Sequence, residues 1–196
     1  MIVTDIPIYN GDIIHHRFAY TFFRNRTLPI GNLIAFRAPM EVEADGMIDL
    51  EDTLENDYIY SEDAINFCWE IPNLDPLGAV AWQRLFNTQI ANILSTQYIN
   101  APIEVDGDDL MVHKEFEQHG LVQQKGKCSV SITYVRDGAA LGHTAINVVA
   151  GRKAPGFAYS TNLSDEQCEN FMRNVIDTFY QMNDDMFIAT TKLIIK

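Results

Sequence analysis

The sequence predicts an α/β protein in which helices pack on a mixed, largely antiparallel sheet. Two observations support this prediction: strand patterns follow each other across a tight turn in residues 127–149, and long helical patterns occupy residues 77–98 and 164–182. Strands and helices do not alternate regularly, which argues against a doubly wound parallel sheet. The length of 196 residues predicts a single domain, residues 1–196, built around one core.

The firmest local prediction is a β-hairpin. In residues 128–134, apolar side chains alternate with Ser and Thr, which is the period of a strand with one buried face. The Asp-Gly dipeptide at 137–138 suits the positive φ angles of a tight turn, and a return strand follows from Leu141. Lys127 lies at the mouth of this hairpin, where its ammonium could hold a phosphate or a carboxylate. The alternative is a solvated lysine that protects a sheet edge.

The N-terminal part predicts a strand in residues 2–8, a short helix in residues 13–23 and a buried strand in residues 33–36 that leads to Arg37. An arginine at the end of a core strand is costly to bury without an anion. Arg37 is therefore a candidate for binding a substrate phosphate or carboxylate. The structural alternative is a salt bridge to one of four nearby carboxylates, Glu41, Glu43, Asp49 or Glu51.

Carboxylates are concentrated in residues 41–63. Asp49, Glu51 and Asp52 lie close together there and are candidate Mg²⁺ ligands, because this hard cation binds carboxylate oxygens together with substrate phosphates. The spacing alone does not distinguish this metal site from a solvated acidic surface.

Three helices and a final strand are predicted after the acidic segment. The Ser-Glu-Asp tripeptide at 61–63 is typical of an N-cap and first turn, and favours a helix over residues 64–71. Residues 77–98 keep helical spacing with a broad apolar face. The Ser-Asp-Glu-Gln sequence at 164–167 forms a capping box, and residues 186–195 predict a closing strand.

Charge and composition limit the classes of partner. The formal net charge is −13, which argues against nucleic acid as the main partner because phosphate backbones are bound by clusters of Lys and Arg. No apolar run approaches the length of a membrane span and the N-terminus lacks a secretory signature, so we expect a cytoplasmic protein without a membrane partner. The three cysteines form no CxxC pair, and we expect buried, reduced thiols.

The central segment resembles the catalytic block of biotin and lipoate protein ligases. The similar features are an acidic turn before Leu110, a lysine opening a strand, and a later strand that ends in Ala-Ile-Asn-Val at 145–148. The resemblance implies the fold of that catalytic domain. It also implies that Lys127 contacts an acyl carboxylate and a phosphate, and that Asp109, Ser129 and Asn147 contribute to substrate binding. ATP and Mg²⁺ are the implied cofactors.

Three departures from the ligase pattern are visible. Val130 stands where the ligases have a glycine, and its side chain could fill space that a ligand needs. The segment between Leu110 and Lys127 is longer than usual, which predicts an extra loop or a longer hairpin around residues 113–120 and leaves Lys114 as a rival for the lysine role. No glycine-rich, arginine-containing adenylate loop occurs upstream.

The whole chain is similar to an uncharacterised archaeal and bacterial family, domain of unknown function 366. Among the shared segments are residues 35–37, 47–52, 59–63 and 107–110. This resemblance implies similarity to the ligase superfamily and no particular activity.

Three functional hypotheses follow. The first is an enzyme of acyl or adenylyl transfer that acts on a small carboxylic acid or a nucleotide, with an acceptor protein as its partner. The second is a non-catalytic binding or regulatory module on the same fold. The third is a Mg²⁺-dependent hydrolase that uses the acidic cluster. The sequence does not distinguish a monomer from a homodimer.

Overall fold

The computed structural model describes residues 1–24, 31–55 and 58–192, without the side chains of Asp45 and Glu51. Its main sheet is antiparallel and has the strand order β1-β2-β9-β8. These strands are β1 (Asn32–Val42), β2 (Ile59–Pro72), β9 (Ala139–Val149) and β8 (Ser129–Arg136). A smaller antiparallel sheet contains β3 (Ile103–Asp106), β4 (Asp109–Val112) and β7 (Gly126–Lys127).

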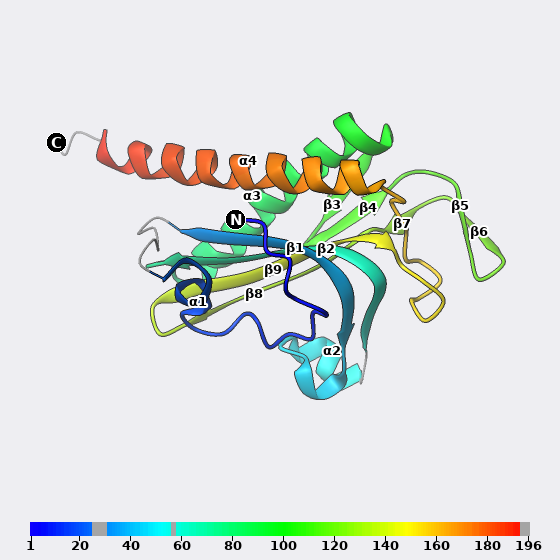
Figure 1. Ribbon diagram of the computed structural model, residues 1–196, viewed down its shortest axis with the longest axis horizontal. Coiled ribbons are helices and arrows are strands. Elements are labelled where there is room, and N and C mark those ends of the chain that lie inside the picture. Colours follow the sequence, from blue (N-terminus) through cyan, green and yellow to red (C-terminus); the bar gives the residue numbers. More distant parts are fainter. Residues whose placement is uncertain (25–30, 56–57, 193–196) are drawn as a thin grey trace.

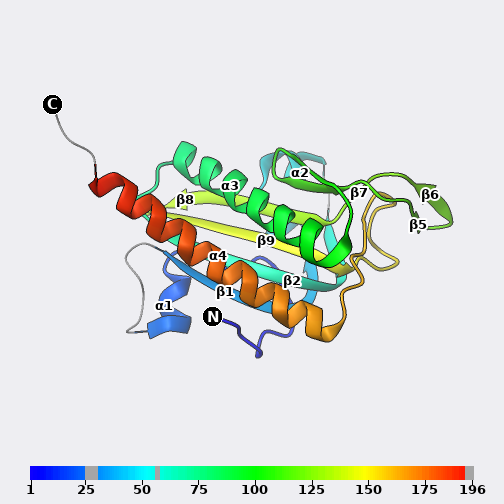
Figure 2. The same ribbon diagram turned by 90° about the horizontal axis from the view of Figure 1, so that it is seen from above.

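Helices cover both faces of the main sheet (Figure 1). The long helices α3 (Pro76–Leu94) and α4 (Asp165–Thr191) lie side by side on one face (Figure 2). The short helices α1 (Phe18–Phe23) and α2 (Leu50–Glu55) lie on the other side. A 3₁₀ turn (Ala44–Gly46) precedes α2 and a π-helical turn (Ser95–Ile99) follows α3. The expected α/β class with a largely antiparallel sheet and packed helices is confirmed.

Strand β2 corrects the predicted helix over residues 64–71. Its side chains alternate between two hydrophobic cores, with Phe67 and Trp69 facing α3 and α4 and Cys68 facing the opposite side. A strand buried on both faces has a continuous apolar run without polar alternation, so its sequence does not distinguish it from a buried helix. Ser61 caps no helix there. Its hydroxyl bonds the carbonyls of Asp63 and Val149 where the pairing of β2 with β9 shifts register.

The two ends of the chain also differ from the prediction. The capping box at Ser164 and Gln167 is present, but α4 continues to Thr191, so the predicted strand over residues 186–195 is wrong through residue 191 and its last residues lie outside the described part. Residues 2–8 form only an isolated bridge to β1, and the first helix begins at Phe18. Within residues 1–24, 31–55 and 58–192, no helix has the length and apolarity needed to cross a membrane.

The predicted hairpin is confirmed. Strands β8 and β9 pair from Ser129 opposite Ile146 to Arg136 opposite Ala139, and Asp137 and Gly138 have φ angles of 49° and 80°. The long segment before Lys127 forms a second hairpin, β5 (Phe116–Gln118) with β6 (Leu121–Gln123). All three cysteines are free and buried, as expected.

Close packing in the sheet centre requires a glycine at position 142. Trp69 of β2 lies directly opposite Gly142 of β9, and a Cβ atom at 142 would lie 2.1 Å from the indole ring.

We therefore predict that Gly142→Ala lowers the free energy of unfolding by about 2–3 kcal/mol, because a fully buried Trp69 has no space to move away. Urea unfolding measures this loss. Gly156→Ala is the matched control, since the nearest atom to a Cβ there is 4.0 Å away. Equal stabilities would contradict the argument.

Candidate functional site

A cavity of about 510 Å³ lies beside strands β8 and β9, on the side of the main sheet away from α3 and α4. The rest of its wall comes from Tyr9 and Gly11, the end of β1, the region of α2, the start of β2, the turn between β3 and β4, Lys127, and the loop before residue 159. Apolar side chains form much of the lining, among them Val42, Met47, Ile48, Ile59, Val130, Ile132 and Phe157.

Lys127 is held at the cavity by its own backbone. Its N–H donates to the carbonyl of Phe157 at 2.9 Å, and its carbonyl accepts from the N–H of Tyr159 at 2.8 Å. On its other side it pairs with Met111 of β4. The rival Lys114 is exposed and does not line the cavity. The structure therefore places Lys127, and not Lys114, at the candidate site.

Gly126 allows Lys127 to occupy this position. A Cβ atom at residue 126 would lie 2.5 Å from the ring of Phe116 and 2.9 Å from Tyr159. The two rings contact each other edge to face at 5.1 Å between centroids. The inserted β5–β6 hairpin, which carries Phe116, thus supports the backbone just before Lys127.

Lys127 forms an ion pair inside the site. Its Nζ lies 2.7 Å from Asp109, and both side chains are about one third exposed. The turn that carries Asp109 is tied to β8, because the Leu110 N–H donates to the hydroxyl of Ser129 at 2.8 Å. The structure thus brings together three residues that the sequence singled out, with the lysine charge already balanced by one carboxylate.

Carboxylates outnumber cations around the cavity. Asp49, Asp52, Asp108 and Asp109 line it, and Lys127 is the one Lys or Arg among its described lining residues. A ligand with one negative charge can pair with Lys127 in place of Asp109. A triphosphate would bring several negative charges to a wall that is already net acidic. The single lysine among the described lining residues does not balance those charges.

The structure describes the side chains of two of the three proposed magnesium ligands, Asp49 and Asp52. Asp49 accepts a hydrogen bond from the N–H of Asp52 at 3.3 Å, as an N-cap of α2 does. The side chain of Glu51 lies outside the described residues. In the part of the chain that the structure describes, no three His, Cys, Asp or Glu side chains are placed to hold a metal ion. The hydrolase hypothesis therefore has no metal site to act through within those residues.

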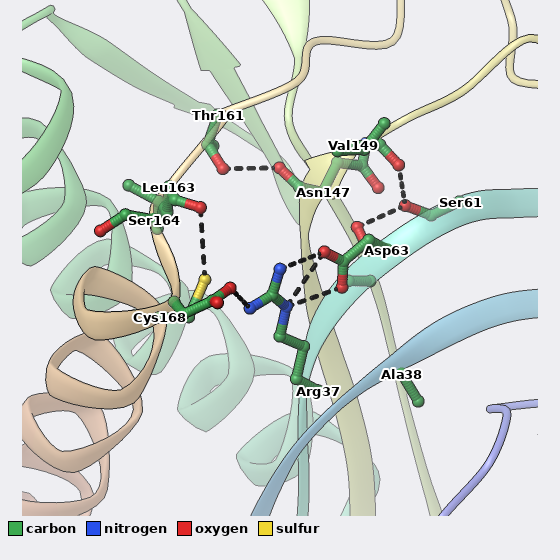
Figure 3. A network of polar contacts seen from close by, with 12 residues as sticks. Arg37, Ala38, Ser61, Asp63, Asn147, Val149, Thr161, Leu163, Ser164 and Cys168 are labelled. Atoms are coloured by element: carbon green, nitrogen blue, oxygen red, sulfur yellow. Dashed lines mark hydrogen bonds and ion pairs between the residues drawn. The ribbon is translucent and has the colours of Figure 1, made fainter.

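Asn147 brings an unsatisfied polar atom to the site. Its backbone is fixed on both sides, because its N–H donates to Cys128 and its carbonyl accepts from the N–H and hydroxyl of Thr161 (Figure 3). Its side-chain Oδ1 is buried without a hydrogen-bond partner in the described structure. Such an atom costs about 1–3 kcal/mol unless a ligand or water binds it. Asn147 lines the cavity, so a bound ligand can satisfy it.

A buried polar network behind the site supports the acidic turn. The side-chain amide of Asn87 on α3 donates to the carbonyl of Asp108 at 2.9 Å and to the hydroxyl of Ser131 at 3.1 Å. Thr144 donates to Asn87 at 2.9 Å and contacts Ser131, and Gln83 also donates to Ser131. Because these groups satisfy each other, α3 fixes the turn beside Lys127 without exposing a polar side chain to an apolar core.

The structure adds His143 to the site. Its ring stacks on Tyr9 at 3.7 Å between centroids, and its Nε2 lies 2.9 Å from Oδ1 of Asn66. Both aromatic residues line the cavity. Sequence reasoning missed them, because a single histidine within a β-strand pattern gives no sign of what the tertiary fold places against it.

Burial keeps His143 uncharged. Desolvation lowers its pKa from the ordinary value of 6.5 to about 3. Below pH 6.5 the unfolded chain binds a proton that the folded chain does not, so folding becomes less favourable as the pH falls towards 3. We predict that this group alone removes about 2 kcal/mol of stability between pH 7 and pH 5.

Urea unfolding of the wild type and of His143→Gln at pH 7 and pH 5 tests this sign. The stability difference between the two proteins should shift by about 2 kcal/mol in favour of the glutamine variant at pH 5. A difference that is independent of pH would show that folding does not lower the pKa of His143.

Arg37 is not among the residues that line this cavity. Its guanidinium forms a two-pronged contact with Asp63 at 2.6 Å and a second contact with Asp165 at 2.7 Å (Figure 3). These hydrogen bonds raise the pKa of Arg37. Neither partner is among the four carboxylates that the sequence suggested. The geometry supports the structural alternative, in which Arg37 connects β1 and β2 to the start of α4.

We predict that Arg37→Met lowers stability by about 1 kcal/mol and leaves ligand binding in the cavity unchanged. The loss is modest because the arginine is about one third exposed and its pairs are screened. Arg173→Met is the control, since the Arg173–Glu169 pair lies within one helix and is more exposed. Thermal unfolding of both variants measures the difference in stability. A loss of ligand affinity in Arg37→Met would show that Arg37 contributes to ligand binding.

Comparisons with known proteins agree with this fold. The family model described as "Domain of unknown function (DUF366)" matches residues 1–194. No curated protein matches the sequence. A protein of unknown function from Pyrococcus horikoshi superposes with a TM-score of 0.82 at 22% identity, covering 100% of this chain and 97% of that chain.

Ligase structures are also similar. LipL1 from P. falciparum in complex with lipoate has a TM-score of 0.57 at 14% identity, covering 93% of this chain and 60% of that chain. Biotin protein ligase from Aquifex aeolicus in complex with biotin and ATP has a TM-score of 0.52 at 11% identity, covering 90% of this chain and 68% of that chain. These likenesses show the fold shared with the catalytic domains of lipoate and biotin ligases.

Proposed function

As the chain belongs to the family described as domain of unknown function DUF366 and has the fold of lipoate and biotin ligases, we propose that its cavity binds a small monocarboxylic acid, or the activated acyl form of one, and supports acyl transfer. The single observation that carries this proposal is the position of Lys127 at the wall of a cavity lined by both apolar and polar side chains. Apolar side chains that contact the body of a ligand, combined with polar groups that fix its orientation, are typical of a small-molecule site.

The chemistry of the lining defines the role of each residue. Lys127 exchanges Asp109 for the ligand carboxylate, or stabilises the negative charge that develops on the acyl oxygen during transfer. Apolar side chains such as Val130 and Ile132 contact the body of the acid. The ligase structures support this assignment, since they contain lipoate or biotin, both of which are acids with apolar bodies.

The residues that line the cavity limit the part that ATP can take in the proposed reaction. Four aspartates and one lysine among the described lining residues do not fit a triphosphate. The proposal therefore includes no step through ATP or Mg²⁺, and transfer from an acyl donor that is already activated fits the residues better. A protein acceptor is compatible with this chemistry, and a basic segment would suit the net charge of −13.

A second candidate is a binding module without catalysis. The observation that favours it is the lack of an activated thiol: Cys128, the cysteine adjacent to Lys127, is fully buried, and burial raises its pKa to about 12. A thiolate is therefore absent at neutral pH. A binding module would bind the acid and would leave an activated acyl donor intact.

The test compares two lysine variants. We predict that Lys127→Met weakens the binding of lipoate, biotin or octanoate at least tenfold, because it removes the cation that pairs with the carboxylate. Lys125→Met should bind like the wild type, since Lys125 pairs with Glu104 outside the cavity. Isothermal titration calorimetry measures affinity, and thermal unfolding checks that both variants are folded.

The outcomes separate the two candidates. Binding that depends on Lys127, together with Lys127-dependent consumption of an acyl thioester or acyl-adenylate, supports acyl transfer. The same binding without consumption of either donor supports the binding module. Equal affinities of the two variants for every acid would refute the assignment of Lys127.

A further inference from the structure

Strand β9 contributes two polar residues to the cavity lining. His143 and Asn147 both line the cavity, and they lie four residues apart on one strand, so their side chains are on the same face. Four residues of extended chain span about 13 Å. Between them lies the small, fully buried side chain of Ala145. Directly opposite on β8, Ile132 pairs with His143 and Val130 with Ala145, so the stretch between the ends is apolar.

The two ends differ in charge. Asn147 donates its backbone N–H to the carbonyl of Cys128, which places the Lys127 end of β7 beside it. The His143 end is packed against Tyr9, within the hydrophobic cluster on this face of the sheet. A carboxylate held by Lys127 therefore lies at one end of the cavity, and the rest of the ligand extends along β9 towards His143.

Hydrogen bonding fixes which nitrogen of His143 carries a proton. The Nδ2 atom of Asn66 lies within hydrogen-bond distance of the carbonyls of Ala38 and Ala64, which can only accept. The other atom of that amide is therefore Oδ1, an acceptor, and Nε2 of His143 must donate to it at 2.9 Å. In the neutral ring, Nδ1 then carries the lone pair and can only accept a hydrogen bond.

From this geometry we propose that the ligand carries an uncharged N–H donor, such as an amide or a urea, at the end remote from its carboxylate, and that Nδ1 of His143 accepts a hydrogen bond from it. This inference rests on the proposed function and narrows its substrate class. An apolar tail would leave the imidazole acceptor unpaired in a closed complex. An ammonium tail would lose its hydration in an apolar cluster. The spacing sets the donor about 10–13 Å from the carboxylate.

The first experiment uses the wild-type protein and two ligands of the same length. Suberic acid monoamide and suberic acid monomethyl ester both carry one carboxylate, and they differ at the far end by an NH₂ group in place of an OCH₃ group. Isothermal titration calorimetry should show that the amide binds about tenfold more tightly, which is the effect of one hydrogen bond gained and one acceptor satisfied. Biotin, with its urea N–H groups, should likewise bind more tightly than octanoate.

The second experiment removes the acceptor. His143→Phe keeps an aromatic ring against Tyr9 and lacks Nδ1. The variant should therefore bind the amide and the ester with about equal affinity. In Lys127→Met both ligands should lose affinity by the same factor, because each has the same carboxylate. Thermal unfolding shows whether His143→Phe is folded, and the wild-type ligand comparison stands without it.

The results distinguish a failure of the donor-bearing ligand from a failure of the proposed function. Equal binding of amide and ester by the wild type, still dependent on Lys127, overturns the donor-bearing ligand and leaves the proposed function in place. An amide preference that persists in His143→Phe also overturns it, since another residue must then accept the hydrogen bond. Failure of every acid to bind overturns both.

Discussion

The arrangement of the whole site depends on the backbone hydrogen bonds of two residues, Lys127 and Cys128. Lys127 pairs with the segment that contains Phe157 and Tyr159, while the N–H of Cys128 donates to Leu110 and its carbonyl accepts from Asn147. These bonds join the small sheet, the main sheet and the loop after β9 at one point. A shift of one residue in this pairing would turn the lysine to the opposite face.

Once that junction is formed, charge determines what the cavity can bind. The ion pair between Lys127 and Asp109 is neutral, and three further aspartates line the wall. A monoanion with an apolar body is compatible with these residues, whereas a polyanion meets repulsion at short range. The fold is shared with ligases whose structures contain lipoate, or biotin and ATP, but the side chains of each cavity decide the chemistry.

Local signals identified several elements of the fold from sequence. The alternation in residues 128–134 and the Asp-Gly turn predicted the β8–β9 hairpin, and the Ser164 capping box predicted the start of α4. Strand β2 was not recognised, because a central strand covered on both faces has the same apolar run as a buried helix. The end of α4 was also misplaced. Asn183, the first residue after the predicted helical pattern of residues 164–182, instead donates its side-chain amide to the carbonyl of Phe179 within the helix.

For the candidate site, the sequence by itself determined the residue types and their order along the chain. Lys127, Asp109, Ser129 and Asn147 were singled out from motifs and resemblance, and the structure places all four on one cavity together with Asp49 and Asp52. Their roles remain proposals.

Only the tertiary structure decided which side chains meet. Arg37 pairs with Asp63 and Asp165, which lie 26 and 128 residues away, and so it lies outside the cavity. His143 is stacked on Tyr9, a residue 134 positions earlier in the chain that forms an isolated bridge to Met40 of β1. The physical reason is that sheet register and packing bring together residues that are distant in the chain, and no local pattern of polarity records those contacts.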